Sequence, residues 1–299
     1  MATPREIRRR IRSVKNIAKV TGALEAVSAS KVRRAQAAAL ATRHYSRAAR
    51  QILHDISART DGGISHPLLE DREQVQAITV VLFTSDRGLA GPYNTNVVRE
   101  AIDFEHAHPN IPIGYVTVGR KGRDLMVRRG AQIVADYSER LPADPKILDI
   151  TPITRTVVDD FLSGGVDEVY IAFTDFVNTL RQEPKVVRLL PLKPLQSDIV
   201  EGDVVGGASE LHALYSFEPN PEAILDETLP AFTELQLYQA ALESTASEHS
   251  ARMVAMRNAT ENANALVDDL TLTYNKARQL AITSEILDIV GGAEALEAE

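Results

Sequence analysis

Two glycines in the segment SDRGLAGPYNTN, residues 85–96, have the spacing that comes nearest to a ligand-binding motif. The segment lies between an expected strand and an expected helix, and open α/β sheets bind ligands at such turns. Gly88 and Gly91 would let backbone N–H groups approach a phosphate. However, neither G-x-G-x-x-G nor G-x-x-x-x-G-K-[ST] is present, and Pro92 has no N–H group to donate. These departures argue against a dinucleotide-dependent enzyme.

We therefore interpret this segment as a structural turn or as a contact with a partner protein. Asp86 and Arg87 are expected to stabilise the turn through local hydrogen bonds, with Gly88 and Gly91 supplying backbone freedom. The dinucleotide-dependent enzyme stays an alternative that rests on the α/β pattern of the middle region alone.

No other residues form a recognisable catalytic or metal-binding set. The seven histidines include no pair four residues apart with an acid between them. His106 and His108 in EHAHPN come nearest, and we interpret them as a solvated helix end. The sequence has no G-x-S-x-G motif and no cysteine, so it offers no anchored serine and no thiolate. We expect no catalytic residue, no metal site and no bound cofactor.

Polar residues in the C-terminal region lie among small and apolar neighbours and form a second candidate site. They belong either to a solvated helix face with pairs at i, i+4 or to a partner contact. These residues are Arg252, Asn275, Lys276, Arg278, Gln279, Thr283 and Glu285.

The middle of the chain alternates between strand and helix patterns. Apolar, β-branched stretches predict strands at 75–86, 111–119, 131–137, 166–176 and 186–192. Helices are expected at 93–106, 120–129 and 152–163. This alternation predicts βαβ units and a largely parallel sheet, that is, a Rossmann-like α/β domain. The acidic, aperiodic segment 196–210 is predicted to be a loop.

Residues 5–59 predict one long helix, because they contain no proline, one glycine and many Ala and Arg residues. Thr3 as N-cap, Pro4 in the first turn and Glu6 as capping-box acid mark its start. Apolar residues recur at steps of three and four, which predicts a single packing stripe. The stripe comprises Ile7, Ile11, Val14, Ile17, Val20, Leu24 and Val27.

A second long helix is predicted behind Pro219 and Pro221, with Pro230 as a kink or break and with Gly291 and Gly292 as its end. Residues 231–290 lack both Pro and Gly. Their stripe runs Leu242, Ala246, His249, Met253, Met256, Thr260, Ala263, Val267, Leu270, Tyr274, Ala277 and Leu280. This sustained pattern predicts a coiled coil with a thin seam of small residues.

The two stripes predict that the terminal helices pair as a long antiparallel coiled coil. The compact domain between them would bring its two ends together and so place the helices side by side. We therefore divide the chain into a helix at 1–60, an α/β domain at 61–210 and a second helix at 211–299.

Charge is distributed unevenly along the chain. Residues 1–59 hold 14 Lys and Arg against three acids, a net charge of +11, and the remaining 19 basic and 38 acidic residues give −19. A basic arm on an acidic body suggests that the arm meets an acidic surface. A coiled-coil nucleic-acid-binding protein is therefore an alternative, although the acidic remainder argues against it. We expect no signal peptide and no membrane-spanning segment, since no apolar run is long enough.

Three long segments, in this order, resemble the gamma subunit of the rotary, proton-translocating ATP synthase. They are REIRRRIRSVKNIAKVTGALEAVSASKVRRAQ (5–36), SDRGLAGPYNTN (85–96) and the stretch from ESTASEHSARM to DIVGGAEAL (243–296). The resemblance implies a non-catalytic central rotor shaft that couples proton flow to ATP synthesis or hydrolysis. Its partners would be the alpha, beta and epsilon subunits and the membrane c-ring, with one copy per complex at the cytoplasmic face of the bacterial cell membrane.

The resemblance also implies which residues meet the alpha/beta ring. The basic arm would face acidic loops of the beta subunits, with Leu24, Lys31 and Arg34 at or near that contact. In the C-terminal helix, Arg252, Gln279, Thr283 and Glu285 match family positions that form polar contacts between shaft and ring. Bound nucleotide and catalytic residues would belong to the ring, and contact with nucleic acid is not expected.

Overall fold

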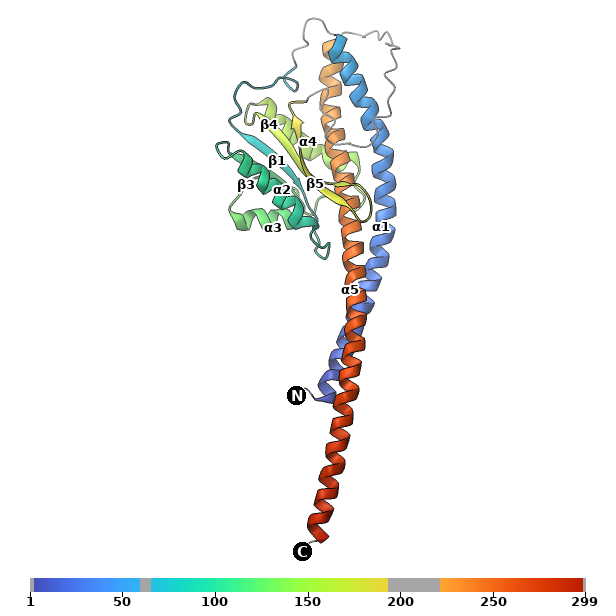
Figure 1. Cartoon of the computed structure of the whole chain (residues 1–299). Helices are drawn as coiled ribbons and strands as arrows, with labels where there is room; N and C mark the ends of the chain where they lie inside the picture. The colour runs from blue at the N-terminus through green and yellow to red at the C-terminus, as the bar shows by residue number, and fades with distance from the viewer. Residues whose placement is uncertain (1–2, 60–65, 193–220, 298–299) are drawn as a thin grey trace. The chain divides into compact units, whose positions relative to one another are not determined.

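The structure, a computed structural model, describes residues 3–59, 66–192 and 221–297. The chain divides into two compact units. The first unit comprises residues 1–28 and 253–299, and the second comprises residues 29–252. Two long helices, α1 (Pro4–Arg59) and α5 (Pro221–Glu297), contribute to both units (Figure 1). The predicted boundaries at 60/61 and 210/211 fall outside the described residues, so the three-part division stays a prediction.

The second unit contains a five-stranded sheet with the order β3-β2-β1-β4-β5. The strands are β1 (Ile78–Phe83), β2 (Ile113–Val118), β3 (Gln132–Asp136), β4 (Glu168–Phe176) and β5 (Gln182–Leu190). Strands β1 to β4 pair in parallel, and only the edge strand β5 is antiparallel to its neighbour. The predicted α/β fold class with a largely parallel sheet is confirmed.

Helices cover both faces of this sheet. They are α2 (Tyr93–Ala107), α3 (Arg120–Arg129) and α4 (Ile147–Leu162), together with the first part of α5. The central strand β1 is buried throughout and alternates between two cores. Ile78, Val80 and Leu82 pack with α2 and α3, whereas Val81 and Phe83 pack with α4 and α5. This arrangement is a three-layer α/β/α sandwich.

The start of α1 follows the predicted capping box. The backbone N–H of Thr3 donates to Glu6 Oε2 at 2.9 Å, and the N–H of Glu6 donates to Thr3 Oγ1 at 3.4 Å. Pro4 is the first helical residue, where its missing N–H group costs no helical hydrogen bond.

The packing stripe of α1 differs from the predicted one. After Ile7, Ile11 and Val14 the least exposed positions continue through Ala18, Thr21, Glu25, Ser28, Val32, Ala35 and Ala39, a regular 3.5-residue repeat. Ile17, Val20 and Val27 are instead more than half exposed. The prediction of one stripe followed hydrophobicity and missed that small residues occupy the seam. The larger side chains therefore form a second, outward stripe.

The stripe of α5 follows the prediction up to Ala277, while Leu280 is exposed. In the first unit, the hydroxyls of Thr21 and Thr260 are 2.7 Å apart across the two helices. In the second unit, Ala35 clusters with Ala246, and Gln239 Nε2 donates to the carbonyl oxygen of Ala39. In these contacts the residue numbers rise along α1 as they fall along α5, so the paired segments are antiparallel.

The predicted end of α5 at Gly291 and Gly292 is wrong. The helix continues through both glycines to Glu297, because a glycine weakens a helix by about 1 kcal/mol without removing a hydrogen bond, and helix-forming residues follow. The helix has no break at Pro230, and a kink at this residue stays a prediction. The predicted loop at 196–210 lies outside the described residues.

Within the first unit, α5 continues beyond the N-terminal end of α1 (Figure 1). Residues 281–287 are all exposed, as expected for helix surface without a neighbouring helix. No helix in the described ranges is long and apolar enough to cross a membrane.

Two glycines provide a matched test of the packing. A Cβ at Gly22 would meet only Thr260 Cγ2, at 3.9 Å, whereas a Cβ at Gly122 would lie 2.6 Å from Thr84 Oγ1. Gly22→Ala should stabilise the chain by about 0.5–1 kcal/mol, because alanine favours helix. Gly122→Ala should destabilise it by about 1–3 kcal/mol through overpacking. Urea unfolding of both variants checks this, and equal shifts would contradict the packing described.

Candidate functional site

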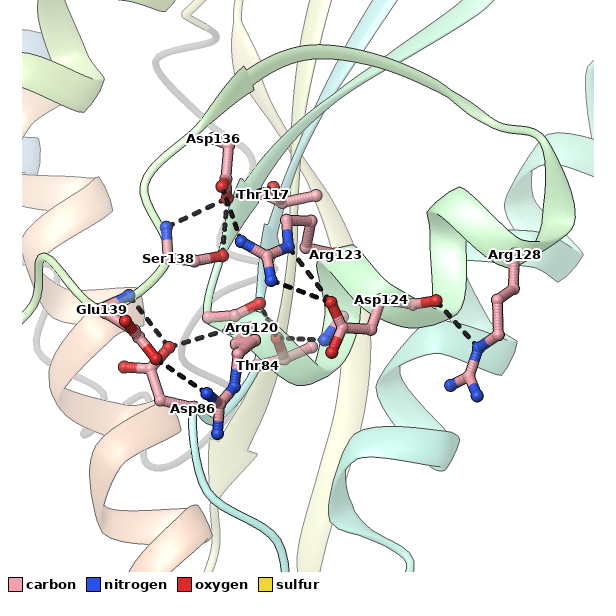
Figure 2. A network of polar contacts seen from close by, with 12 residues as sticks. Thr84, Asp86, Thr117, Arg120, Arg123, Asp124, Arg128, Asp136, Ser138 and Glu139 are labelled. Atoms are coloured by element: carbon pink, nitrogen blue, oxygen red, sulfur yellow. Dashed lines mark hydrogen bonds and ion pairs between the residues drawn. The ribbon is translucent and has the colours of Figure 1, made fainter.

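The turn after β1 is bound to the N-terminus of α3. The backbone N–H of Arg120 donates to Asp86 Oδ1 at 2.8 Å, that of Lys121 to the Ser85 carbonyl oxygen at 3.0 Å, and that of Gly122 to Thr84 Oγ1 at 2.9 Å. Figure 2 shows Asp86 and Thr84 facing this helix. Three consecutive residues therefore accept the first N–H groups of α3, which a helix otherwise leaves unpaired.

N–H groups at a helix N-terminus often bind phosphate, but here groups of the chain itself accept from those of α3. Gly119, at φ 105°, and Gly122 bring the backbone so close to Thr84 that a Cβ at either position would clash with it. The donors at the α3 N-terminus and the space beside them are thus used by the chain itself. The N–H groups of Arg120, Lys121 and Gly122 are therefore not available to a phosphate.

Asp86 also links the turn to the segment that follows β3. Its Oδ1 accepts a second bond, from the backbone N–H of Glu139 at 3.0 Å, and Glu139 pairs with the Arg120 side chain (Figure 2). Asp86 thus joins the ends of three neighbouring strands. Arg87 contributes its carbonyl oxygen, which accepts from Ser85 Oγ at 2.7 Å.

A second carboxylate, Asp136, gathers polar groups at the end of β3. Partial burial acts to raise the pKa of Asp136, but hydrogen bonds from Ser138, Thr117 and Arg123 outweigh it and lower the pKa below its usual value. Asp136 is exposed, so its ion pair with Arg123 contributes little stability. The network in Figure 2 therefore connects the turns that follow β1 and β3 with the N-terminus of α3.

Arg252 on α5 reaches the same turn from the other side. Its Nε donates to the Gly88 carbonyl oxygen at 3.2 Å, and its Nη2 donates to that of Arg87 at 3.2 Å. Its Nη1 donates to Glu248 Oε1 at 2.7 Å and lies 3.3 Å from His249 Nδ1. Arg252, one residue of the polar C-terminal set, thus contacts the glycine turn.

Buried or largely buried groups surround Arg252, and their charges affect one another's pKa. Burial raises the pKa of Glu248, while the charges of Arg252 and Lys31 act in the opposite direction. Burial, Arg252 and Lys31 together lower the pKa of His249 to about 4, so this side chain is neutral at physiological pH. Burial and the Glu248 charge raise the pKa of Tyr93 above its usual value.

The other predicted contact residues are Lys31, Arg34, Leu24, Gln279, Thr283 and Glu285. Lys31 is partly buried and acts on Glu248 and His249, whereas Arg34 is exposed. In the first unit, Leu24 is half-buried. Gln279, Thr283 and Glu285 are exposed on α5. The Thr283 hydroxyl donates to the Gln279 carbonyl oxygen at 3.0 Å, within one helical turn.

Sequence reasoning missed Glu248, although its spacing of four from Arg252 is the known signal for a helical ion pair. The predicted stripe placed His249 in the seam, and His249 is buried, but no sequence pattern indicated its contact with Arg252. Thr84 carried no signal, because its role depends on the approach of α3. His108 stacks on Phe104, and His106 lies near Arg129. Among the described residues, no three His, Asp or Glu side chains gather to hold a metal ion.

Comparison with known proteins identifies the class of this α/β unit and its paired helices. The family model described as ATP synthase matches residues 3–296. The ATP synthase gamma chain of Roseiflexus sp. (strain RS-1) is 47% identical over 298 residues, covering 99% of each chain. The gamma chain of Chloroflexus aurantiacus (strain ATCC 29366 / DSM 635 / J-10-fl) is 46% identical with the same coverage. The chain therefore belongs to the ATP synthase gamma-chain family.

Solved structures agree with the fold. The rotor of the Euglena gracilis mitochondrial ATP synthase matches with a TM-score of 0.64 at 18% identity, over 93% of this chain and 98% of that one. The central stalk and c-ring structure from Tetrahymena thermophila matches with a TM-score of 0.57 at 21% identity, over 80% and 99% of the chains. The alternative function of nucleic-acid binding finds no support among these proteins.

Removal of the Asp86 carboxylate should loosen the turn. Asp86→Ala leaves the N–H groups of Arg120 and Glu139 without their acceptor, which should lower the free energy of unfolding by about 1–2 kcal/mol. Urea denaturation measures the change, and Asp103→Ala on the exposed face of α2 is the control. A loss no larger than that of the control would count against the capping role.

Acid should destabilise the chain through His249. Its pKa is about 4 in the folded chain, against about 6.5 when unfolded. The unfolded chain therefore binds more protons between these values, and stability is full above about pH 6.5 and falls as the pH drops toward 4. The total loss should reach about 3 kcal/mol.

His249→Gln should remove this part of the pH dependence, measured from urea midpoints between about pH 7 and 4.5. The exposed His106→Gln should keep it. Identical slopes in the two variants would refute the assignment.

Proposed function

We propose that this chain is the central rotor shaft of an ATP synthase, coupling proton flow through the membrane sector to ATP synthesis or hydrolysis by rotation. The observation that carries this proposal is the outward apolar surface of the first unit. Ile17, Val20 and Val27 on α1 are more than half exposed, as are Leu280, Ile286 and Leu287 on α5. So much exposed apolar surface on two helices indicates a covering partner.

The covering partner is the ring of alpha and beta subunits. A ring that surrounds the helices would contact the apolar side chains of the outward stripe. It would also form separate polar contacts with the exposed part of α5. Surface contacts of this kind contribute roughly 0–1 kcal/mol each, so they can break and re-form as the shaft turns. Torque then arises because the ring states differ in their contact energy with an asymmetric shaft.

Named residues are assigned to these contacts. Leu24, with Lys31 and Arg34 nearby, would lie at the acidic loops of the beta subunits, and the net charge of +11 over residues 1–59 supports this. Gln279, Thr283 and Glu285 would form polar contacts on the exposed face of α5. The same contact would include Arg252, whose three guanidinium nitrogens also have partners in its own chain.

The catalytic residues and the nucleotides would belong to the alpha and beta subunits. The epsilon subunit and the c-ring would bind the α/β unit and the adjoining end of the shaft. One copy would be present per complex, at the cytoplasmic face of a bacterial cell membrane, held there through these partners alone.

Reconstitution tests this function directly. Mixed with alpha and beta subunits of a related ATP synthase, the chain should co-purify as a three-subunit complex that hydrolyses ATP, while the chain alone should hydrolyse none. Failure to form an active complex would sink the proposal.

Within that complex, Gln279→Ala and Glu285→Ala should each lower turnover by up to about fivefold, the effect of losing one surface polar contact of up to about 1 kcal/mol. Asp103→Asn, on the exposed face of α2 in the other unit, is the matched control and should leave turnover unchanged. Full turnover in both α5 variants would remove these residues from the ring contact.

A further inference from the structure

Arg252 is the side chain through which α5 holds the turn after β1. It donates to two consecutive carbonyl oxygens, those of Arg87 and Gly88, from different nitrogens of one guanidinium group. Its side chain is 12% exposed, and that of Glu248, which accepts at 2.7 Å one helical turn earlier, is 20% exposed. A planar guanidinium can make these three bonds at once because its donors form a rigid fork.

The turn that Arg252 holds is conformationally strained. Leu89 follows Gly88 directly and has a φ of 65°, in the left-handed region, which is unfavourable for a residue with a Cβ. Its side chain is 63% exposed, so burial does not offset the cost. Strained backbone persists where the surroundings over-determine it.

Hydrogen bonds on both sides of Leu89 hold the turn in this conformation. On one side, Ser85 is fixed by Asn94, which accepts from its N–H at 2.9 Å, and Asp86 is fixed by α3. On the other side, Ala90 is buried and its carbonyl oxygen accepts from the Tyr93 N–H. Between these anchors, Arg252 holds the carbonyl groups of the two residues that precede Leu89. Its bonds therefore act where the backbone is least favourable.

A comparison along α5 sets Arg252 apart from an ordinary helical ion pair. Arg257 and Glu261 also form an i, i+4 pair, at 3.2 Å, but both side chains are about two-thirds exposed, at 68% and 65%. The Arg257 side chain bonds to Glu261 within its own helix. The Arg257–Glu261 pair is thus an ordinary solvated ion pair. The Glu248–Arg252 pair has the same spacing but links α5 to a turn of the α/β sheet.

We propose that Arg252, oriented by Glu248, is a positioning residue that fixes the 85–91 turn to α5, so that the turn follows the helix when the helix rotates. The inference rests on the proposed rotor function for its consequence and on the hydrogen bonds above for its geometry. A turn released from α5 would relax at Leu89 and absorb part of the twist that the helix delivers to the α/β sheet.

Arg252→Lys is the informative variant. Lysine keeps the charge and the stem but cannot donate to two carbonyl oxygens and a carboxylate in this fork geometry. Arg252→Gln and Glu248→Gln complete the series, and Arg257→Gln is the matched control from the same helix.

The first measurement uses the full chain alone. Amide hydrogen exchange of residues 86–91 should become about tenfold faster in Arg252→Lys and Arg252→Gln, because their local opening loses two hydrogen bonds. Exchange in β2 should stay unchanged, as should all exchange in Arg257→Gln. Unchanged exchange of the turn in Arg252→Lys, or equal acceleration in Arg257→Gln, would overturn the positioning role.

The second measurement uses the complete ATP synthase in vesicles. With Arg252→Lys, ATP hydrolysis should be largely retained while protons pumped per ATP fall by about half or more, and Glu248→Gln should show the same split to a smaller degree. A general folding defect would lower both activities together and would overturn the mechanical consequence, as would an unchanged ratio. If the chain without substitutions forms no active complex, the rotor function fails, whereas the exchange result still decides the fixation of the turn.

Discussion

Close approach of α1 and α5 depends on small side chains at a 3.5-residue repeat. These small side chains determine both how strongly the helices pair and which side chains face outward. Ala18, Thr21 and Ser28 on α1 occupy positions where a cohesive coiled coil would have leucine, as Ala246, Thr260 and Ala263 do on α5. Such a seam removes little apolar area from water, so it gains less hydrophobic free energy per turn. The larger apolar side chains, excluded from the seam, are left on the outside.

The helix α5 changes its neighbours along its length, and its composition changes with them. From Leu225 to Ala241 it contributes large apolar residues to the core of the sheet. Between Glu243 and Ser250 its buried residues are mostly small and polar, and Ser247 donates to the Thr174 carbonyl oxygen. Residues 278–287, beyond Ala277, are all exposed. One continuous helix thus combines a core element, a polar contact and a free surface.

The sequence predicted well where local pattern decides the structure. All five strands, the three short helices and the capping box of Thr3 and Glu6 follow from periodicity and residue type. Prediction from the sequence was wrong where two local arrangements are nearly equal in free energy. Ile17 and Ala18 are neighbours, and only the partner helix decides which one faces the seam. Likewise, Gly291 and Gly292 weaken a helix without ending it when helix-forming residues follow.

The candidate site could be predicted only in part, because its contacts join residues distant in sequence. The turn at 85–91 and the polar C-terminal helix were each recognised, but no local pattern shows that Arg252 donates to Arg87 and Gly88. The role of Thr84 depends on the close approach of Gly122 on a helix 38 residues later. Such contacts need the topology of the sheet before they can be foreseen.

The carboxylate of Asp86 at the N-terminus of α3 has a consequence for the conditions in which the protein works. A fold that leaves this position open is stabilised by whatever anion fills it, by an amount that follows the ligand concentration. Here the acceptor is covalently part of the chain, at a fixed and permanent effective concentration. The hydrogen bonds at this helix N-terminus therefore need no bound anion, and they do not vary with the concentration of adenine nucleotides.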